Sequence, residues 1–227
     1  PCKICYSRMI TLGIETSTPA TGLALYDGES VRCSIAPIGT GGHSALLPAI
    51  IDELLAPTGI RKNDIELIAV SRGPGSFTGL RVGITLAKAL SFALGIPVVS
   101  VDTFEVYCYP HRGKAKLVVP VIDAKKNEFF AAGYYPDKDG TTEKLFPERL
   151  YGFKELVDEI SRFRRETFVI TGYDAHLLDA KFPSNIARDN TPDPIVVAKF
   201  GMEKFSKQGG DDVVSLEPFY FRKSEAE

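Results

Sequence analysis

The stretch that most constrains the fold of this chain runs from Leu67 to Val101 and alternates apolar runs with glycine-rich breaks. The apolar run 67–70 has the length and density of a buried strand. A Gly-Pro-Gly loop at 73–75 interrupts it, a long apolar segment typical of a helix follows, and a second apolar run spans 98–101. A strand, helix and strand of this length form a parallel crossover, so the sequence predicts an α/β fold with a central sheet.

The helix of this crossover has no clear polar side. Ser76 or Thr78 can cap its first turn, and Gly95 followed by Pro97 ends it. Small residues recur at every fourth position, which would allow another backbone to approach closely. Two interpretations stay open: tight packing inside one chain, and a helix that also faces a partner protein. The small residues are Gly79, Gly83, Ala87, Ser91 and Gly95.

Composition excludes several classes of protein. Apolar residues make up 44% of the chain and charged residues 25%, which is ordinary for a globular protein. The net charge of −2 argues against a stand-alone nucleic-acid binder, which would carry a basic excess. Arg81 and Lys88 interrupt the longest apolar run before it reaches the roughly 18 residues of a membrane span, so no membrane contact is expected.

The order of the predicted elements suggests two related halves. An Asp27-Gly28 hairpin signal lies between two early strands, and a second hairpin follows a boundary near residue 105. We expect 1–8 to be a disordered leader or cloning remnant, 9–105 a first domain, and 106–227 a second, smaller one. Strands are expected at 10–16, 22–26, 31–35, 117–123, 128–135 and 167–171, and helices at 44–55, 153–163 and 195–207.

Few residues carry a chemical signal. Cys2 and Cys5 form a lone CxxC without a second ligand pair, and Cys33, Cys108 and the histidines lack metal-ligand spacing. We therefore expect no metal site and free thiols in a reducing cytoplasm. The loop 73–79 with Arg81 is the best candidate for a phosphate site, because backbone N–H groups at a helix N-terminus bind anions. It is neither a Walker loop nor a GxGxxG motif, and a tight structural turn explains it at least as well. Glu15 and Asp123 end apolar strands, where kinase-like folds hold a metal–nucleotide complex, but both could be solvated strand ends.

Several segments together resemble the TsaB (YeaZ) family. They are MITLGIETSTPATGLALYDGE, GGHSALLPAIIDELL, AVSRGPGSFTGLRVGITLAKAL, VVSVDTFE, VPVIDAKKNEFFAAGYY and EPFYFR, of which GPGSFTGLR is the most specific. The resemblance runs from Met9 to about Arg222. It implies an actin/hexokinase/Hsp70-like (ASKHA) fold, with two related domains that each hold a mixed β-sheet flanked by helices.

The resemblance also implies a role in forming threonylcarbamoyladenosine beside the tRNA anticodon. In that system TsaD is the catalytic subunit, TsaB is its non-catalytic scaffold or activator, and the ATPase TsaE joins them. TsaD carries a His-x-x-x-His metal motif just after the strand that follows this helix, whereas 100–105 here reads SVDTFE. The resemblance therefore favours the partner and not the catalyst. The alternatives are a TsaD-like ATP-dependent transferase, a metallopeptidase-like enzyme, or a small acyl or sugar kinase of the same fold.

The family's mode of pairing implies a partner surface on the helices 44–55 and 78–94, used for TsaD or for a homodimer when the chain is alone. Contact with tRNA would be indirect, and no catalytic residue, metal or cofactor is expected beyond weak or vestigial nucleotide binding. The interface residues expected are Leu46, Leu47, Ile50, Ile51, Leu54, Gly79, Val82, Gly83, Leu86, Ala87 and Leu90. The vestigial phosphate loop would comprise Gly73, Pro74, Gly75, Ser76, Thr78, Gly79 and Arg81.

Overall fold

The chain divides into two compact units in a computed structural model that describes residues 9–38, 47–137, 142–187 and 191–220. Unit 1 holds residues 1–103 and 193–219, and unit 2 holds 104–192 with 220–227. The expected leader 1–8 lies outside the described residues. The expected second domain of 106–227 differs from this division, because 193–219 packs with the first unit.

Unit 1 is built on a five-stranded mixed sheet in the order β3-β2-β1-β4-β5. β1 pairs antiparallel with β2 and parallel with β4, and β4 pairs parallel with β5. The expected mixed sheet with a parallel crossover is thereby confirmed. The strands are β1 (Thr11–Glu15), β2 (Thr21–Tyr26), β3 (Val31–Ile38), β4 (Leu67–Gly73) and β5 (Val98–Asp102).

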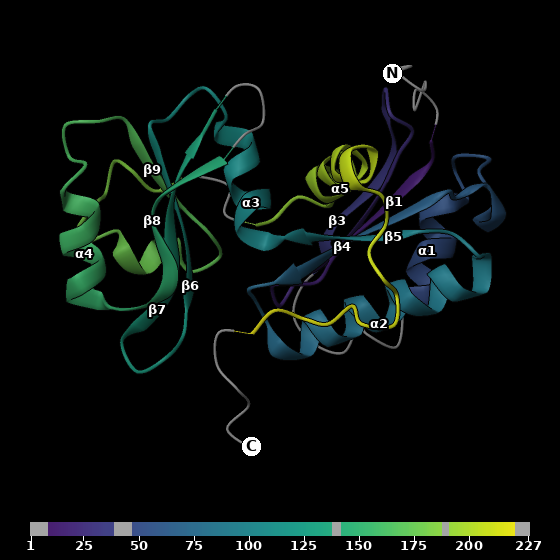
Figure 1. The fold of residues 1–227 in the computed structure, drawn as a ribbon, viewed down its shortest axis with the longest axis horizontal. Coiled ribbons are helices and arrows are strands. Elements are labelled where there is room, and N and C mark those ends of the chain that lie inside the picture. The colour runs from purple at the N-terminus through teal and green to yellow at the C-terminus, as the bar shows by residue number, and fades with distance from the viewer. Residues whose placement is uncertain (1–8, 39–46, 138–141, 188–190, 221–227) are drawn as a thin grey trace. The chain divides into compact units, whose positions relative to one another are not determined.

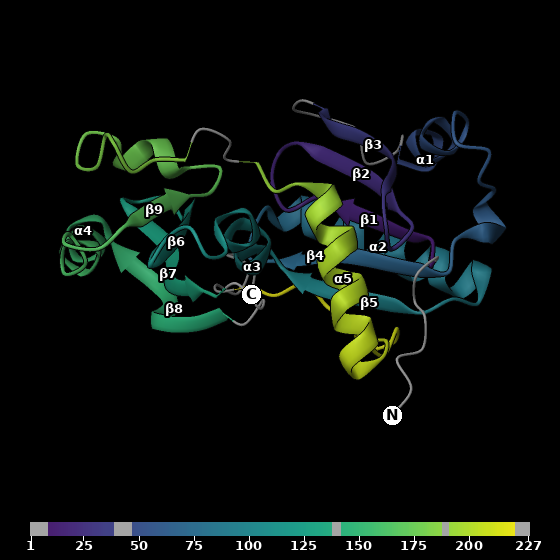
Figure 2. The same cartoon turned by 90° about the horizontal axis from the view of Figure 1, so that it is seen from above.

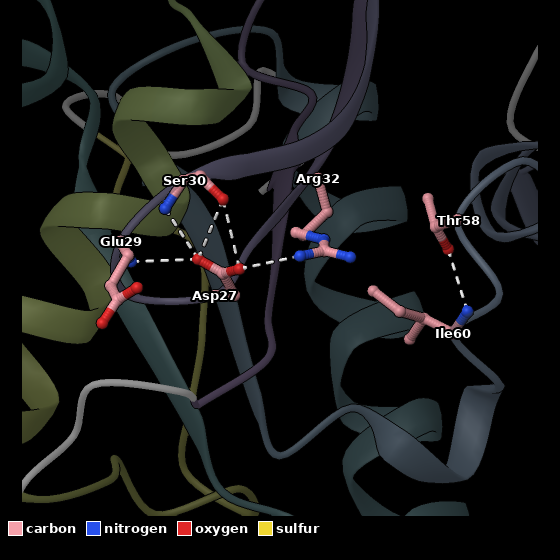
Figure 3. A network of polar contacts seen from close by, with 6 residues as sticks. All are labelled: Asp27, Glu29, Ser30, Arg32, Thr58 and Ile60. Atoms are coloured by element: carbon pink, nitrogen blue, oxygen red, sulfur yellow. Dashed lines mark hydrogen bonds and ion pairs between the residues drawn. The ribbon is translucent and has the colours of Figure 1, made fainter.

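The hairpin predicted from Asp27-Gly28 joins β2 to β3, and the Asp27 carboxylate closes its turn (Figure 3). Its Oδ1 accepts hydrogen bonds from the backbone N–H groups of Glu29 at 3.0 Å and Ser30 at 2.7 Å. Its Oδ2 accepts one from Arg32 Nη1 at 3.3 Å. The Ser30 backbone bond is the main reason that the pKa of Asp27 lies below its usual range.

Helices cover both faces of the unit 1 sheet (Figures 1 and 2). α1 and α2 enclose one core with Ile68 and Val98, whereas α5 covers the opposite face, where Met202 packs on Leu67 and Val99. This alternation follows from the period of two in a strand. The elements are α1 (Leu47–Leu55), the short 3₁₀ helix η2 (Lys62–Asp64), α2 (Phe77–Leu94) and α5 (Pro194–Gln208).

Unit 2 repeats the first four strands of this arrangement. Its sheet has the order β8-β7-β6-β9, with β6–β7 and β7–β8 antiparallel and β6–β9 parallel. The duplicated hairpin start expected from the sequence is confirmed, but the long strand β8 was not expected. The elements are α3 (Thr103–Cys108), η3 (Tyr109–His111), β6 (Leu117–Asp123), β7 (Glu128–Pro136), β8 (Thr142–Gly152), α4 (Phe153–Ser161), β9 (Phe168–Thr171) and η4 (Ala175–Leu178).

Candidate functional site

The carboxyl ends of β1 and β4 meet at one edge of the unit 1 sheet, where parallel α/β sheets usually carry their polar groups. Glu15 ends β1 and is 0% exposed. Its Oε1 accepts hydrogen bonds from the backbone N–H of Ser17 at 2.6 Å and from the Ser17 hydroxyl at 2.5 Å. Its Oε2 accepts one from the Ser71 hydroxyl of β4. The alternative of a solvated strand end is therefore wrong for Glu15.

The electrostatics of Glu15 follow from these neutral partners. Burial raises the pKa of its carboxyl group, and the hydrogen bonds from Ser17 and Ser71 only partly oppose that shift. The carboxyl group joins the β1–β2 loop to β4 and so holds this edge of the sheet together. Its bonding capacity is used within the protein, which favours a structural role.

The Gly-Pro-Gly loop packs directly against the β1–β2 loop. The Ser76 N–H donates to the carbonyl oxygen of Ser17 at 2.7 Å. A Cβ at Gly75 would overlap that same oxygen, and a Cβ at Gly79 would overlap the carbonyl oxygen of Thr16. One N–H group of the loop is thus already bonded to a backbone oxygen of the same unit, and both glycines allow the two loops to pack closely. The tight-turn interpretation explains the glycines without a phosphate.

The first turn of α2 is capped by a side chain of the same unit. Ser76, one of the two expected caps, accepts a hydrogen bond from the Gly79 N–H at 3.3 Å. The Arg81 guanidinium lies over the Phe77 ring, 3.6 Å from its centroid, and the Arg81 side chain is exposed. At the other end Gly95 has a left-handed conformation with φ 68°, as its role in ending the helix requires.

Asp123 holds a turn in unit 2. Its Oδ1 accepts from the Lys125 backbone N–H at 2.8 Å and its Oδ2 from Lys125 Nζ at 2.7 Å. Partial burial raises the pKa of Asp123, but these bonds from Lys125 outweigh it and leave the pKa below its usual range. Within the described ranges, no three His, Cys, Asp or Glu residues are grouped closely enough to hold a metal ion.

The expected interface residues of α1 lie in the core of unit 1. Leu47, Ile50, Ile51 and Leu54 are at most 9% exposed and pack with β-strand side chains, while Leu46 lies outside the described residues. The residues of α1 that reach solvent are Pro48, Ala49, Asp52 and Glu53.

The expected interface residues of α2 are buried or half-buried in the same unit. Gly83 and Ala87 are buried. A Cβ added at Gly83 would overlap the Thr16 hydroxyl oxygen. Gly79 is half-buried against the β1–β2 loop. The small residues from Gly79 to Ser91 therefore serve tight packing inside the unit, which was one of the two interpretations, whereas Gly95 is exposed and ends the helix. The remaining expected residues, half-buried against the same core, are Val82, Leu86 and Leu90.

A different face of α2, which was not expected from the sequence, reaches solvent. Phe92 is 90% exposed there. Helical periodicity could have identified this face, since its residues lie on the side of the helix opposite the small residues. Among the described helices α2 alone has the length and mean hydropathy, 1.3, to cross a membrane, although it packs on the sheet here. The exposed residues are Thr78, Arg81, Thr85, Ala89, Phe92 and Ala93.

Comparisons with known proteins agree on one group of relatives. A family model described as TsaD, tRNA N6-adenosine threonylcarbamoyltransferase, matches residues 38–187. The tRNA threonylcarbamoyladenosine biosynthesis protein TsaB of Bacillus subtilis is 30% identical over 96% of both chains. A tRNA N6-adenosine threonylcarbamoyltransferase of Legionella pneumophila is 34% identical over 51% of this chain and 38% of its own length.

Solved structures extend the likeness to the fold. A Pseudomonas aeruginosa protein described as similar to peptidase YEAZ superposes with a TM-score of 0.80 at 20% identity, covering 94% of this chain and all of that one. A second structure, YeaZ from the same organism, gives a TM-score of 0.74 at 22% identity over 93% of this chain and 99% of its own. With two related mixed sheets flanked by helices, the chain has the expected ASKHA fold.

Proposed function

The chain belongs to the TsaB family of tRNA threonylcarbamoyladenosine biosynthesis proteins, and from that premise we propose that it is a non-catalytic subunit that binds and supports TsaD. Membership of the family places the chain in the pathway that makes this modified nucleoside. In the proposed complex TsaD performs the transfer beside the anticodon, TsaE supplies ATPase activity, and this chain contacts tRNA only indirectly in the cytoplasm.

The observation that carries the proposal is the exposed face of α2. Its small side packs on the sheet, yet Phe92 on the other side is 90% exposed, an unusual position for a large aromatic residue. Aromatic side chains are enriched among the residues that dominate binding energy at protein interfaces. We assign the partner surface to this face in place of the buried residues expected from the sequence.

A non-catalytic role is also supported by the residues near the end of β5. The position of the TsaD metal motif reads SVDTFE, and Ser100 within it is bonded to residues of the same unit. The Ser100 hydroxyl donates to Asp211 Oδ2 at 2.5 Å, and the Ser100 carbonyl oxygen accepts from Lys204 Nζ at 2.6 Å. These contacts give Ser100 a structural role.

The test is size-exclusion chromatography with light scattering on the full chain, alone and mixed with TsaD from the same organism. We expect a one-to-one complex for the wild type and at least about tenfold weaker binding for Phe92→Asp, because a charge would be desolvated at the contact. The matched control is Leu177→Asp, an exposed apolar residue of unit 2 that is 43% exposed. A substitution within the small-residue stripe, such as Gly83→Arg, cannot test partner binding, because Gly83 is buried and the change would disturb folding.

Three outcomes decide between the hypotheses. Loss of binding by Phe92→Asp, with an unchanged control, supports the α2 face as the partner surface. Equal binding by both variants would reject this surface. The wild-type chain could instead fail to bind TsaD and form threonylcarbamoyladenosine on tRNA by itself with ATP. That result would reject the scaffold role in favour of the transferase alternative.

A further inference from the structure

The C-terminal part of unit 1 leaves α5 and runs across β5 and along α2, the yellow ribbon in Figure 1. Its residues 213–215 form a turn, closed by a hydrogen bond from the Leu216 N–H to the Asp212 carbonyl oxygen at 3.0 Å. Gly209, with a φ of 79°, ends the helix, and Gly210 follows it. We call residues 211–219 the clasp. Its contacts fall at three separate points on unit 1.

The first point is the outer edge of β5, the last strand of the sheet. The Asp211 N–H donates to the Val98 carbonyl oxygen at 2.8 Å. Asp211 Oδ2 accepts hydrogen bonds from the backbone N–H of Ser100 at 2.7 Å and from its hydroxyl at 2.5 Å. The clasp thus satisfies edge groups of β5 much as a neighbouring strand would.

The second point is the middle of α2. Lys88 Nζ donates to the carbonyl oxygens of Val214 at 2.9 Å and Leu216 at 3.2 Å. Leu216 is 6% exposed and inserts into the core between α2 and the sheet, whereas Val214 is 84% exposed. Val213, which is half-buried, packs against the same core, so two apolar side chains and one lysine hold this part of the clasp.

The third point is the Gly-Pro-Gly loop. The Phe219 N–H donates to the Arg72 carbonyl oxygen at 2.7 Å, and the Arg72 guanidinium lies 5.9 Å from the Phe219 ring centroid. The Phe219 carbonyl oxygen lies 2.7 Å from the place where a Cβ on Gly73 would be. The clasp therefore ends on the loop that begins α2, and Gly73 is the residue that allows this approach.

We propose that residues 211–219 are a detachable clasp, whose docking orders the Gly-Pro-Gly loop and whose release exposes the edge of β5. Leu216 is the one clasp side chain that is buried among those described. A segment with few buried apolar contacts opens at a lower free energy than the core strands. The two glycines after α5 place a hinge where such an opening would begin. This inference does not rest on the proposed function.

Hydrogen exchange with mass spectrometry on the full chain tests the clasp. In the wild type, the amides of 211–219 are expected to exchange faster than those of β1 and β4. The exchange rate of 211–219 should not change with low concentrations of denaturant, because a local opening exposes little surface. Lys88→Met should speed exchange in 211–219 at least about tenfold, since hydrogen bonds to a charged group are lost. The segment 72–80 should accelerate with it, while β1 and unit 2 stay unchanged.

The control is Lys62→Met, which removes an exposed ion pair to Asp52 in the same unit and should leave both segments unchanged. Asp211→Asn provides a second way to weaken docking if Lys88→Met affects folding. Clasp amides that exchange only as slowly as β4 would show that the segment is part of the core. Faster exchange in 211–219 without any change in 72–80 would overturn the coupling to the loop.

Discussion

Glu15 is a buried carboxyl group that accepts hydrogen bonds from the amide and hydroxyl of Ser17 and from the hydroxyl of Ser71, and burial raises its pKa. The folded state therefore holds the proton more tightly than the unfolded chain. This contribution to stability is fully present below the unfolded pKa, near 4.5, and is lost as the pH rises through the folded pKa. Glu15→Gln removes the titration, so its free energy of unfolding relative to the wild type should rise between pH 4 and pH 8.

Urea denaturation at several pH values measures this difference, with Glu53→Gln as the exposed control on α1. Parallel pH profiles for wild type and Glu15→Gln would contradict it. The sequence located Glu15 at a strand end but could not show its burial. That burial depends on Ser71, which lies 56 positions away and reaches Glu15 only when β1 and β4 pair.

The seating of α2 on the β1–β2 loop depends on glycine at position 79. Alanine there would gain about 1 kcal/mol of helix propensity, but its Cβ would overlap the Thr16 carbonyl oxygen, a backbone atom that cannot move easily. We expect Gly79→Ala to lower the free energy of unfolding by about 1–3 kcal/mol. Gly152→Ala should change it by less than about 0.5 kcal/mol, because nothing lies within 4 Å of that Cβ. If chemical denaturation gave Gly79→Ala a higher free energy of unfolding than the wild type, the β1–β2 loop would have room for the added Cβ.

At the scale of elements, local signals identified most helices and strands but not their partners. The crossover 67–101 was predictable because capping, glycine and apolar periodicity agree there. β8 was missed because Pro147 and the adjacent charged pairs Glu143-Lys144 and Glu148-Arg149 hide the alternation of a strand that β7 stabilises by pairing. The sequence also could not show that the small residues of α2 face the interior, since small residues allow close packing against the same chain or against a partner protein.

At the scale of the whole chain, the path of α5 was not predictable from its sequence. An apolar stripe on a helix shows that it packs, but not on which sheet. Gly13 and Gly201 allow the close contact that α5 makes with β1 and β4. Both glycines appear ordinary until the two segments, far apart along the chain, are brought together.

This non-local packing predicts how fragments behave. Residues 104–192 hold a four-stranded sheet with its own core around Val119, Leu156 and Ile170, so this fragment should unfold cooperatively on heating. Residues 1–103 alone lack α5 and would expose Leu67 and Val99, so we expect no cooperative transition. Joining 1–103 to 193–220 through a flexible linker of about 15 residues should restore one. Circular dichroism and calorimetry on the three proteins measure this difference. A fragment 1–103 that melts like the joined protein would mean that the sheet does not need α5, and that the boundary near 105 already completes a domain.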